Sequence, residues 1–450
     1  VESQIRGLTI AVRNAGDASS LLNTAEAAMA EQANMLQRMR ELAIQSSNGT
    51  NSVADRLAIQ DEVSQLRSEL DRISSTTSWA GNKLLDGSFT TKKFQVGSGA
   101  TETVSLSITA QGSADLGVHR YDTIGTAQGS ITDGASDKTV TDFDVLGKDG
   151  AAEAAFAGGS SAKAVAAAVN ADSSSTGVTA QAVTIARISL SAAPSGLVTF
   201  SINGGGTETA ISETVTSNTD LTNIKNAINA AAGSTGVTAD FYGSDKSYLV
   251  LTDADGDDIF LSNFSDTGTA TNLDVSVGNF DGTSFSSATS VVSAASGVND
   301  AVVNGVVRME STQAFSISDE ETDSTNTTAA TGYLGNTNDS ASSSATNVSG
   351  INVSTEAGAR SAISVLDGAL EAVNETRSEL GATSNRLEYT INNLSSMVTN
   401  AGASKSRIED ADFAVETSNL TKAQILSQAA TAMLAQANAS KQSVLSLLQG

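Results

Sequence analysis

Apolar residues recur every three or four positions through both ends of this 450-residue chain, and neither end contains a proline. Such spacing places the apolar side chains on one face of a helix and is typical of a coiled-coil seam. Because a seam has to be buried against other helices, the simplest arrangement is an antiparallel bundle built from both termini. The pattern is carried by Ile5, Leu8, Val12, Ala15, Leu22, Met29, Leu36, Ala43, Ile59, Val63, Leu66, Leu70, Ile73, Leu366, Leu370, Val373, Leu380, Leu387, Ile391, Leu394 and Val398.

The N-terminal end divides into two predicted helices. The periodicity predicts the first over residues 2–46 and the second over residues 53–75. Between them, Gly49 suits a left-handed exit from the first helix, and Ser52 suits the N-cap of the second. Alternating residues farther on predict strands around residues 94–96 and 104–108.

The middle of the chain is rich in Ser, Thr, Gly and Asp and predicts short strands. It contains an internal repeat, because residues 161–181 align without gaps on residues 220–240 at a constant offset of 59. The letters GVTA stand at the same place in both copies, and Asn170 aligns with Asn229. Each copy predicts a short helix, a glycine turn and a strand. Two copies favour duplicated α+β modules over a solenoid, which needs more repeats.

The charge is concentrated in the same middle part. Residues 121–347 carry 7 Lys+Arg against 27 Asp+Glu, whereas the remainder carries 18 against 23. An acidic surface repels nucleic acid and anionic lipid and keeps densely packed copies soluble. No run of apolar residues approaches the length of a membrane span, and no cleaved signal pattern follows Val1. We therefore expect neither nucleic-acid binding nor membrane insertion.

The sequence contains no strong motif for catalysis, metal binding or phosphate binding. The chain has no cysteine and one histidine, His119, so it lacks the residues for a thiolate nucleophile or a zinc-binding motif. The acidic run 253–258 has its glycine and its twelfth residue at the wrong places for a calcium loop, which favours a turn between strands. The glycines 204–206 lack the Lys-Ser/Thr of a phosphate-binding loop and predict a hairpin turn. The sequence therefore predicts no catalytic, metal or cofactor-binding residues, and no enzyme.

The two ends are also recognisable as sequences. LQRMREL (residues 36–42), LLDGSF (84–89) and SRIEDADFA (406–414) lie in long stretches that resemble the terminal regions of bacterial flagellin. The resemblance covers about the first 110 and the last 95 residues, and matches of this length are far more specific than a short motif.

The resemblance implies a multidomain α + β fold, in which both termini form a helical bundle and β-rich variable domains are inserted between them. We expect an N-terminal helical core with a β-hairpin region at residues 1–115 and outward-facing variable domains at 116–347. A C-terminal core helix at 348–405 and a filament-core helix at 406–450 would complete the subunit.

The implied function is that of a self-assembling structural subunit of the flagellar filament, which is an extracellular motility structure. Export would use the flagellar type III pathway rather than a cleaved signal peptide. Two alternatives remain: a hook–filament junction protein with similar terminal helices, and a flagellin-like surface adhesin that binds polysaccharide. The resemblance also implies about fifty further residues before the position that matches Val1, without which filament growth should be defective.

The expected contacts are with other copies of the subunit, and by resemblance with an export chaperone and with cap or junction proteins. The apolar residues of the last segment exceed what one side of a helix can bury within a subunit, which indicates a subunit interface. These residues are Ile408, Val415, Leu420, Leu426, Met433, Leu434, Leu445 and Leu448.

A receptor contact is implied as well. Flagellins are recognised by Toll-like receptor 5 of animals through their N-terminal core helices, and the family's contact positions match Arg38, Leu42 and Glu62 here. Arg38 and Leu42 are four residues apart, so we expect them on one helix face, as an exposed Arg–Leu pair. A planar guanidinium beside a leucine is a plausible binding hot spot.

Overall fold

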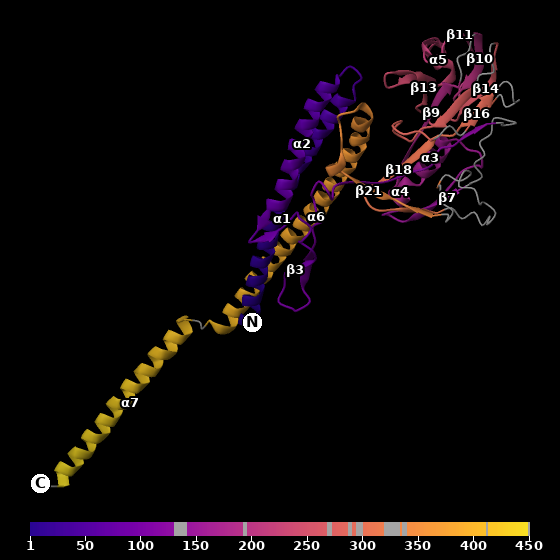
Figure 1. The fold of residues 1–450 in the computed structure, drawn as a ribbon. Coiled ribbons are helices and arrows are strands. Elements are labelled where there is room, and N and C mark those ends of the chain that lie inside the picture. The colour runs from indigo at the N-terminus through magenta and orange to yellow at the C-terminus, as the bar shows by residue number, and fades with distance from the viewer. Residues whose placement is uncertain are drawn as a thin grey trace. The chain divides into compact units, whose positions relative to one another are not determined.

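The computed structural model describes residues 1–129, 142–191, 196–267, 272–286, 290–293, 300–318, 334, 340–410 and 413–448. Two compact units account for the chain. Unit 1 contains residues 1–23, 91–107 and 380–450, and unit 2 contains residues 24–90 and 108–379. Figure 1 shows the ribbon with its elements labelled.

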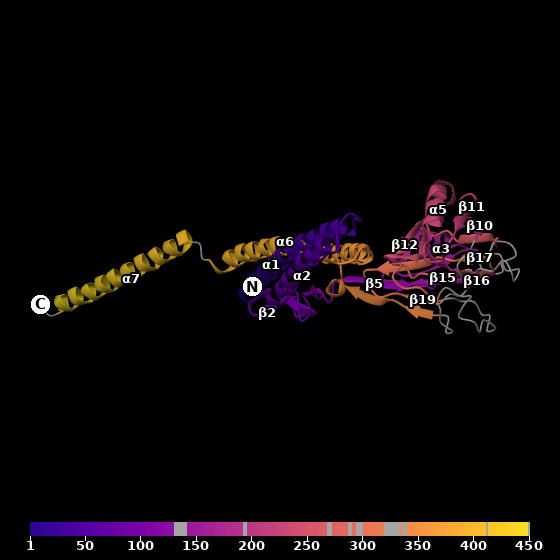
Figure 2. The same cartoon turned by 45° about the horizontal axis from the view of Figure 1, so that its top comes forward.

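Helices occupy both ends of the chain and two short stretches of the middle. The terminal helices α1 and α6 each run through both units and lie side by side in Figures 1 and 2. The helices of the described residues are α1 (Glu2–Ser47), α2 (Val53–Thr76), α3 (Ala162–Ala171), α4 (Ser173–Thr176), α5 (Thr222–Thr235), α6 (Glu356–Glu409) and α7 (Phe413–Leu448), with a 3-10 turn at Val348–Gly350.

The predicted antiparallel bundle of both termini is confirmed. Contacts between α1 and α6 run in opposite sequence order in each unit. In unit 1, Leu8 and Ala11 pack with Leu394. In unit 2, Glu26 pairs with Arg377 at 3.9 Å, and Arg40 pairs with Asp367. Fourteen of the 21 seam residues predicted from the heptads are buried, as expected for side chains on one helix face. The other seven are half-buried, namely Ile5, Val12, Leu66, Ile73, Leu370, Ile391 and Val398.

The link between α1 and α2 differs from the expectation in one respect. Gly49 is not in the left-handed region, so it does not close α1 in the expected way. The guanidinium of Arg56 on α2 caps the link instead, because it donates to the carbonyl oxygens of Ser46, Asn48 and Asn51 at 2.9–3.0 Å. These bonds satisfy carbonyls that a helix end leaves without an intrahelical donor.

The predicted N-cap of α2 is confirmed. The backbone N–H of Asp55 donates to the hydroxyl of Ser52, and the backbone N–H of Ser52 donates to the Asp55 carboxylate at 3.0 Å. This reciprocal capping box also lowers the pKa of Asp55, because its charged form accepts the hydrogen bonds from Ser52.

Strands fill the middle of the chain. They pair in antiparallel fashion in two small hairpins, β1–β2 and β3–β4, and in sheets of the orders β11-β10-β14-β17-β6, β20-β19-β7-β8 and β12-β13-β9-β18-β5-β21, with β15 and β16 added beside β9. The strands are β1 (Ser78–Trp79), β2 (Asn82–Lys83), β3 (Lys92–Gln95), β4 (Thr103–Leu106), β5 (Gly117–Asp122), β6 (Ala127–Gly129), β7 (Asp142–Leu146), β8 (Ala151–Ala155), β9 (Thr179–Leu190), β10 (Gly196–Asn203), β11 (Thr209–Val215), β12 (Val237–Tyr242), β13 (Asp245–Asp253), β14 (Ile259–Asp266), β15 (Asn272–Val277), β16 (Ser290–Ser293), β17 (Ala301–Val303), β18 (Val306–Ser311), β19 (Ser316–Ser318), β20 (Ser340–Ser342) and β21 (Ser344–Asn347).

The two copies of the internal repeat make equivalent hydrogen bonds. In the first copy, the side chain of Asn170 on α3 donates to the carbonyl of Ala180 and accepts from its N–H, at 2.7 and 2.8 Å. In the second copy, Asn229 on α5 makes the same two bonds to Ala239, both at 2.8 Å. In each copy the glycine before the strand is left-handed, with φ of 69° and 84°.

The repeat is longer than the sequence alignment indicated. Each copy begins with a hairpin, β7–β8 in the first and β10–β11 in the second, so the module is a hairpin, a helix and a strand. The helices α3 and α5 then bury matching residues, Val165 and Val169 in one copy and Ile224 and Ile228 in the other. The two modules carry the two apolar cores of the middle region, and β9 belongs to both of these cores.

Candidate functional site

The long terminal helices hold most of the predicted contact residues, and ion pairs join α1 to α6 in both units. In unit 1, Lys405 donates to the Glu2 carboxylate at 2.6 Å, and this hydrogen bond is the main reason that the pKa of Glu2 is lowered. In unit 2, Arg40 pairs with Asp367. Glu2, Arg40, Asp367 and Lys405 are not among the contact residues predicted from the sequence. Opposite charges beside the apolar seams of two antiparallel helices were the available signal.

Arg38 is held in an exposed ion-pair cluster on the surface of α1 and α2. Its Nε and Nη2 donate to Oε1 of Glu62 at 3.0 and 2.8 Å, and its Nη1 donates to Glu41 at 3.1 Å. About half of each side chain of Arg38 and Glu62 is exposed. The hydrogen bond to Glu62 is the main reason that the pKa of Arg38 is raised. These three hydrogen bonds orient the guanidinium of Arg38.

Leu42 does not form an exposed pair with Arg38. Its side chain is 2% exposed and lies in the helical core, so the expectation of a surface Arg–Leu pair is wrong. Residues four apart on a helix differ in direction by about 40°, which is enough to turn one of them from the rim into the core. The accessible member of the predicted pair is Arg38.

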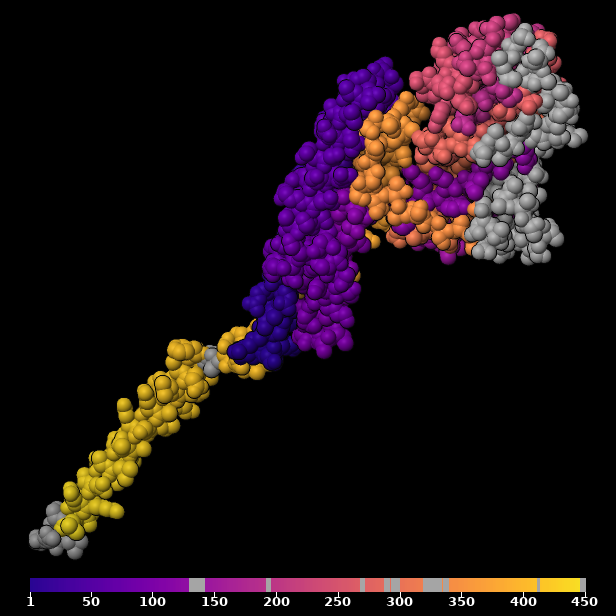
Figure 3. Space-filling model, viewed as in Figure 1, coloured from indigo at the N-terminus to yellow at the C-terminus, as the bar shows by residue number. Residues whose placement is uncertain are grey.

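Helix α7 exposes a wide apolar surface. Val415, Leu420, Leu426, Met433, Leu434 and Leu445 are between 55 and 70% exposed, and Ile408 at the end of α6 is 74% exposed. The side chain of Leu448 lies outside the described residues. Figure 3 shows the side chains of α7, in yellow, standing out from the helix.

Part of this apolar surface lies along one side of α7, whereas Leu420, Leu434 and Leu445 face a different side of the helix. Val415, Leu426, Met433 and Val444 are separated by 11, 7 and 11 residues, and both intervals return to nearly the same side of a helix. Alanines at 423, 430 and 437 lie on the same side and let another helix approach closely. A surface of this shape and composition can accommodate another helix.

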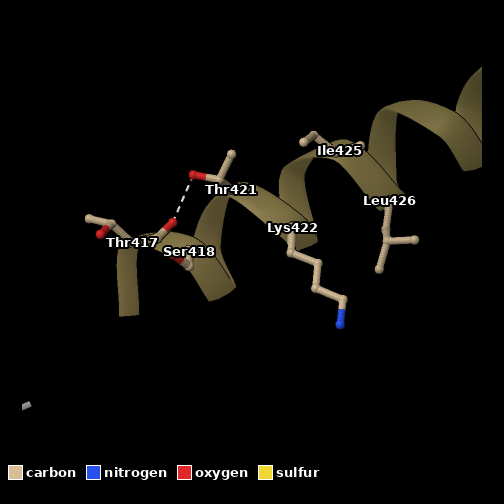
Figure 4. A pocket seen from close by; sticks show the side chains of 6 residues that line it. All are labelled: Thr417, Ser418, Thr421, Lys422, Ile425 and Leu426. Carbon is tan, nitrogen blue, oxygen red and sulfur yellow. Dashed lines mark hydrogen bonds between the residues drawn. The ribbon is translucent and has the colours of Figure 1, made fainter. Parts of the chain in front are cut away.

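The hollow on α7 is not a small-molecule site. Its cavity of about 500 Å³ is lined by residues of this helix alone: Thr417, Ser418, Thr421, Lys422, Ile425 and Leu426 (Figure 4). The Thr421 hydroxyl donates to the carbonyl of Thr417 at 2.7 Å, so it satisfies its own helix. A groove with a single wall can seat a neighbouring helix, but it cannot enclose a substrate.

The glycine-rich and acidic runs of the middle region lie in turns between strands. The glycines 204–206 lie in the turn between β10 and β11, and the acidic run lies between β13 and β14, as predicted. Asp253 accepts the backbone N–H groups of Asp255, Gly256 and Asp257, and burial raises its pKa. Among the described residues, no group of three or more His, Cys, Asp or Glu side chains could hold a metal ion.

His119 lies in β5 opposite Ser311 on one neighbouring strand and Ala345 on the other. It is half-buried, and burial lowers its pKa. Its buried Nδ1 has no hydrogen-bond partner within the described residues.

No helix in the described ranges is both long and apolar enough to cross a membrane.

Models of known protein families match the terminal helices of this chain. The model of the bacterial flagellin N-terminal helical region matches residues 1–90, and that of the C-terminal helical region matches residues 363–448. The flagellin hook IN motif matches residues 142–193, which is the first copy of the repeat.

Curated relatives extend the similarity over the whole chain. The chain is 39% identical to B-type flagellin of Pseudomonas aeruginosa, over 100% of this chain and 89% of that protein. It is 33% identical to flagellin B of Vibrio cholerae, over 99% of this chain and 85% of the relative. Among solved structures, FliC from Burkholderia pseudomallei is 20% identical over 82% of this chain and 99% of that one, with a TM-score of 0.32, which is too low to support an argument about the arrangement of parts.

Proposed function

This chain belongs to the bacterial flagellin family, the non-enzymatic structural subunits of the extracellular flagellar filament that drives motility, and we propose that α7 is the element through which its copies pack in the filament. Polymerisation is the property of the family. The choice of α7 is supported by one observation, namely that its apolar side chains are more than half exposed along the whole described helix.

The energetics agree with this role. Burying a Leu or Met side chain contributes about 1.5–3 kcal/mol, so a few such residues per neighbour are enough for a stable contact. A filament arises when the same contact repeats without closing into a ring. We propose in addition that residues 348–405 and 1–115 form the helical layer outside the filament core, and that residues 116–347 project outwards, where their acidic surface keeps neighbouring copies apart.

Assembly of purified protein tests the role of α7. We expect Leu426→Asp together with Met433→Asp to abolish sedimentable polymer, because two carboxylates would have to be buried between helices. The matched control is Gln428→Asp, which adds a carboxylate on the opposite side of the same helix. Polymer that forms from the double variant as readily as from the unmodified protein would refute the proposal.

The same surface supports two further partners implied by the family. Before export, an apolar helix of this kind needs protection from aggregation, and we propose that the export chaperone covers α7. At the two ends of a filament, cap and junction proteins would meet the same helices. Competition between a purified chaperone and polymer growth tests the first of these assignments, because a chaperone bound elsewhere would not block growth.

Recognition by Toll-like receptor 5 is proposed for the surface around Arg38 and Glu62. Three hydrogen bonds hold the guanidinium, and the remaining exposure of both side chains leaves them accessible in the monomer. We expect Arg38→Ala to lower receptor activation by about tenfold, which corresponds to about 1.4 kcal/mol. Leu42 contributes by packing beneath this surface rather than by direct contact.

The control for this experiment is Arg72→Ala. Arg72 forms an exposed ion pair with Glu69 on α2, three residues apart, so its loss removes the same kind of charge at another place. Reporter cells would be dosed with monomer of each variant after circular dichroism has shown equal helix content. An unchanged dose response for Arg38→Ala, or an equal loss for both variants, would exclude this surface.

A further inference from the structure

Three aromatic rings surround one arginine on the eight-stranded sheet of unit 2. Arg187 lies in the middle of β9, and its neighbours Ala186 and Ile188 point into the apolar core, so Arg187 is on the opposite face of the sheet. Its guanidinium carbon is 4.9 Å from the ring centre of Phe285, 5.1 Å from that of Tyr248 and 5.9 Å from that of Tyr242. The rings of Tyr242 and Phe285 meet edge to face at 5.4 Å.

The guanidinium of Arg187 has rings around it but no acceptor. No hydrogen bond or ion pair joins it to any residue that the structure describes, although it is only partly exposed. A guanidinium carries five N–H donors in a planar fork that matches a carboxylate. Donors that are half removed from water and left unpaired cost free energy, which a bound acceptor would recover.

A second arginine of the same domain, Arg308, has the carboxylate acceptors that Arg187 lacks. Arg308 also stacks on an aromatic ring, with 4.0 Å between its guanidinium carbon and the centre of Phe280. It donates in addition to both carboxylate oxygens of Asp122 and of Asp281, at 2.6–3.0 Å. Arg120 pairs with Glu310. Of the three arginines between residues 116 and 347, only Arg187 has no carboxylate partner in the described chain.

We propose that Arg187, Tyr242, Tyr248 and Phe285 form a binding site for an acidic saccharide, namely a pyranose ring that carries one carboxylate. The carboxylate pairs with the fork of Arg187, and the C–H face of the sugar lies against Tyr242, which is 39% exposed. The hydroxyls of Tyr242 and Tyr248 make no hydrogen bond within the described residues and meet the sugar hydroxyls. A tyrosine ring supplies both the apolar face and the polar tip that such a ligand needs.

The charge of the domain restricts the ligand further. Residues 121–347 carry 27 acidic against 7 basic residues, so a polyanion is repelled before it reaches Arg187. A saccharide with a single carboxylate keeps the attraction to the guanidinium and avoids most of this repulsion. Two natural sources supply such a group, a uronic acid and a sialic acid.

Saturation-transfer NMR on the full chain tests the site. The probes are glucuronic acid, N-acetylneuraminic acid and glucose, and glucose differs from glucuronic acid at one carbon. We expect transfer to at least one acidic sugar and none to glucose, and the acid with the larger signal identifies the source. Transfer to neither acidic sugar, or equal transfer to glucose and glucuronic acid, would overturn the proposal.

Three variants separate binding from folding. Arg187→Gln removes the charge, and Arg187→Lys keeps the charge but loses the planar fork, so each should weaken binding at least about tenfold. Lys163→Gln is the control, because Lys163 is a cation of the same domain that pairs with Asp255 and Asp257. Thermal melts show whether each variant is folded. Unchanged binding by folded Arg187→Lys and Arg187→Gln would refute the site.

Discussion

At the scale of single residues, one asparagine in each copy of the module bonds the helix to the strand that follows it. Each places its carboxamide beside a strand and supplies one donor and one acceptor, which is what another strand would supply. In the second copy this occupies the outward N–H and carbonyl of Ala239 on β12, the edge strand of its sheet. Asn229 therefore also closes an edge that could pair with another chain.

Replacing this asparagine should weaken the module. We expect Asn229→Ala to lower the free energy of unfolding by about 1–2 kcal/mol, because two hydrogen bonds are lost and a strand edge is uncovered. Chemical denaturation followed by circular dichroism measures the change. Asn226→Ala on the same helix is the control, since Asn226 is also exposed but makes no hydrogen bond with its side chain within the described residues. Equal stability of the two variants would show that the hydrogen bonds from Asn229 to Ala239 do not stabilise the module.

His119 should make stability depend on pH. Burial lowers its pKa in the folded protein, so the unfolded chain binds a proton more readily. The stability that neutral His119 contributes is therefore present above its ordinary pKa of about 6.5 and is lost as the pH falls through the lower folded pKa. We expect His119→Asn to be less sensitive to this change than the unmodified protein.

The measurement is the difference in melting temperature between these two proteins at pH 7.5 and at progressively lower pH. Comparing two proteins removes the effect of the many carboxylates, which both share. A difference that stays constant over this range would show that burial of His119 does not perturb its protonation.

At the scale of elements, the two C-terminal helices differ in what holds them. Helix α6 buries residues such as Leu366, Val373 and Leu387, whereas every side chain of α7 that the structure describes is exposed. An isolated helix in water is stabilised by little beyond its own hydrogen bonds. Tertiary packing therefore distinguishes two segments whose sequences are both strongly helical.

Hydrogen exchange should show this difference directly. In dilute protein we expect amides of α7 to exchange at least about a hundredfold faster than those in the buried part of α6, because opening α7 exposes no core. The internal control is α2, which buries Ile59, Val63 and Leu70 and should resemble α6. After polymerisation, protection of α7 should rise. Equal protection of α6 and α7 in the monomer would contradict an uncovered α7.

At the scale of the whole molecule, the chain enters and leaves its middle part at one place. The backbone N–H of Val348 donates to the carbonyl of Leu116, and that of Ser349 donates to the carbonyl of Ser113, both at 2.9 Å. Because the two ends of the insertion are hydrogen-bonded to each other, a short linker can replace it without stretching the helices.

Deleting residues 116–347 and joining the ends with a short Gly-Ser linker should leave the terminal helices folded. We expect the helical circular dichroism per molecule to be retained, because α1 and α6 keep their seam and their ion pairs. The melting temperature should fall, since Arg120 then no longer donates to Ser361 and Ser364 on α6. A loss of most of the helical signal would show that the core depends on the inserted domains.

The sequence by itself determined those features that depend on near neighbours. Heptad spacing predicted α1, α2 and the antiparallel bundle, Ser52 predicted the start of α2, and the constant offset of 59 predicted two equivalent modules. Each rests on interactions within a few residues, or on a periodic face that has to be buried somewhere.

Only the tertiary structure decided which residues far apart in the sequence come into contact. It placed Leu42 in the core, used Arg56 instead of a left-handed Gly49 to close α1, and joined β9 to strands from distant parts of the chain. It also brought Phe285 and Tyr242 to Arg187. Such contacts form between residues that are far apart in sequence. Which of them forms depends on how all the elements pack at once, and no local pattern encodes that choice.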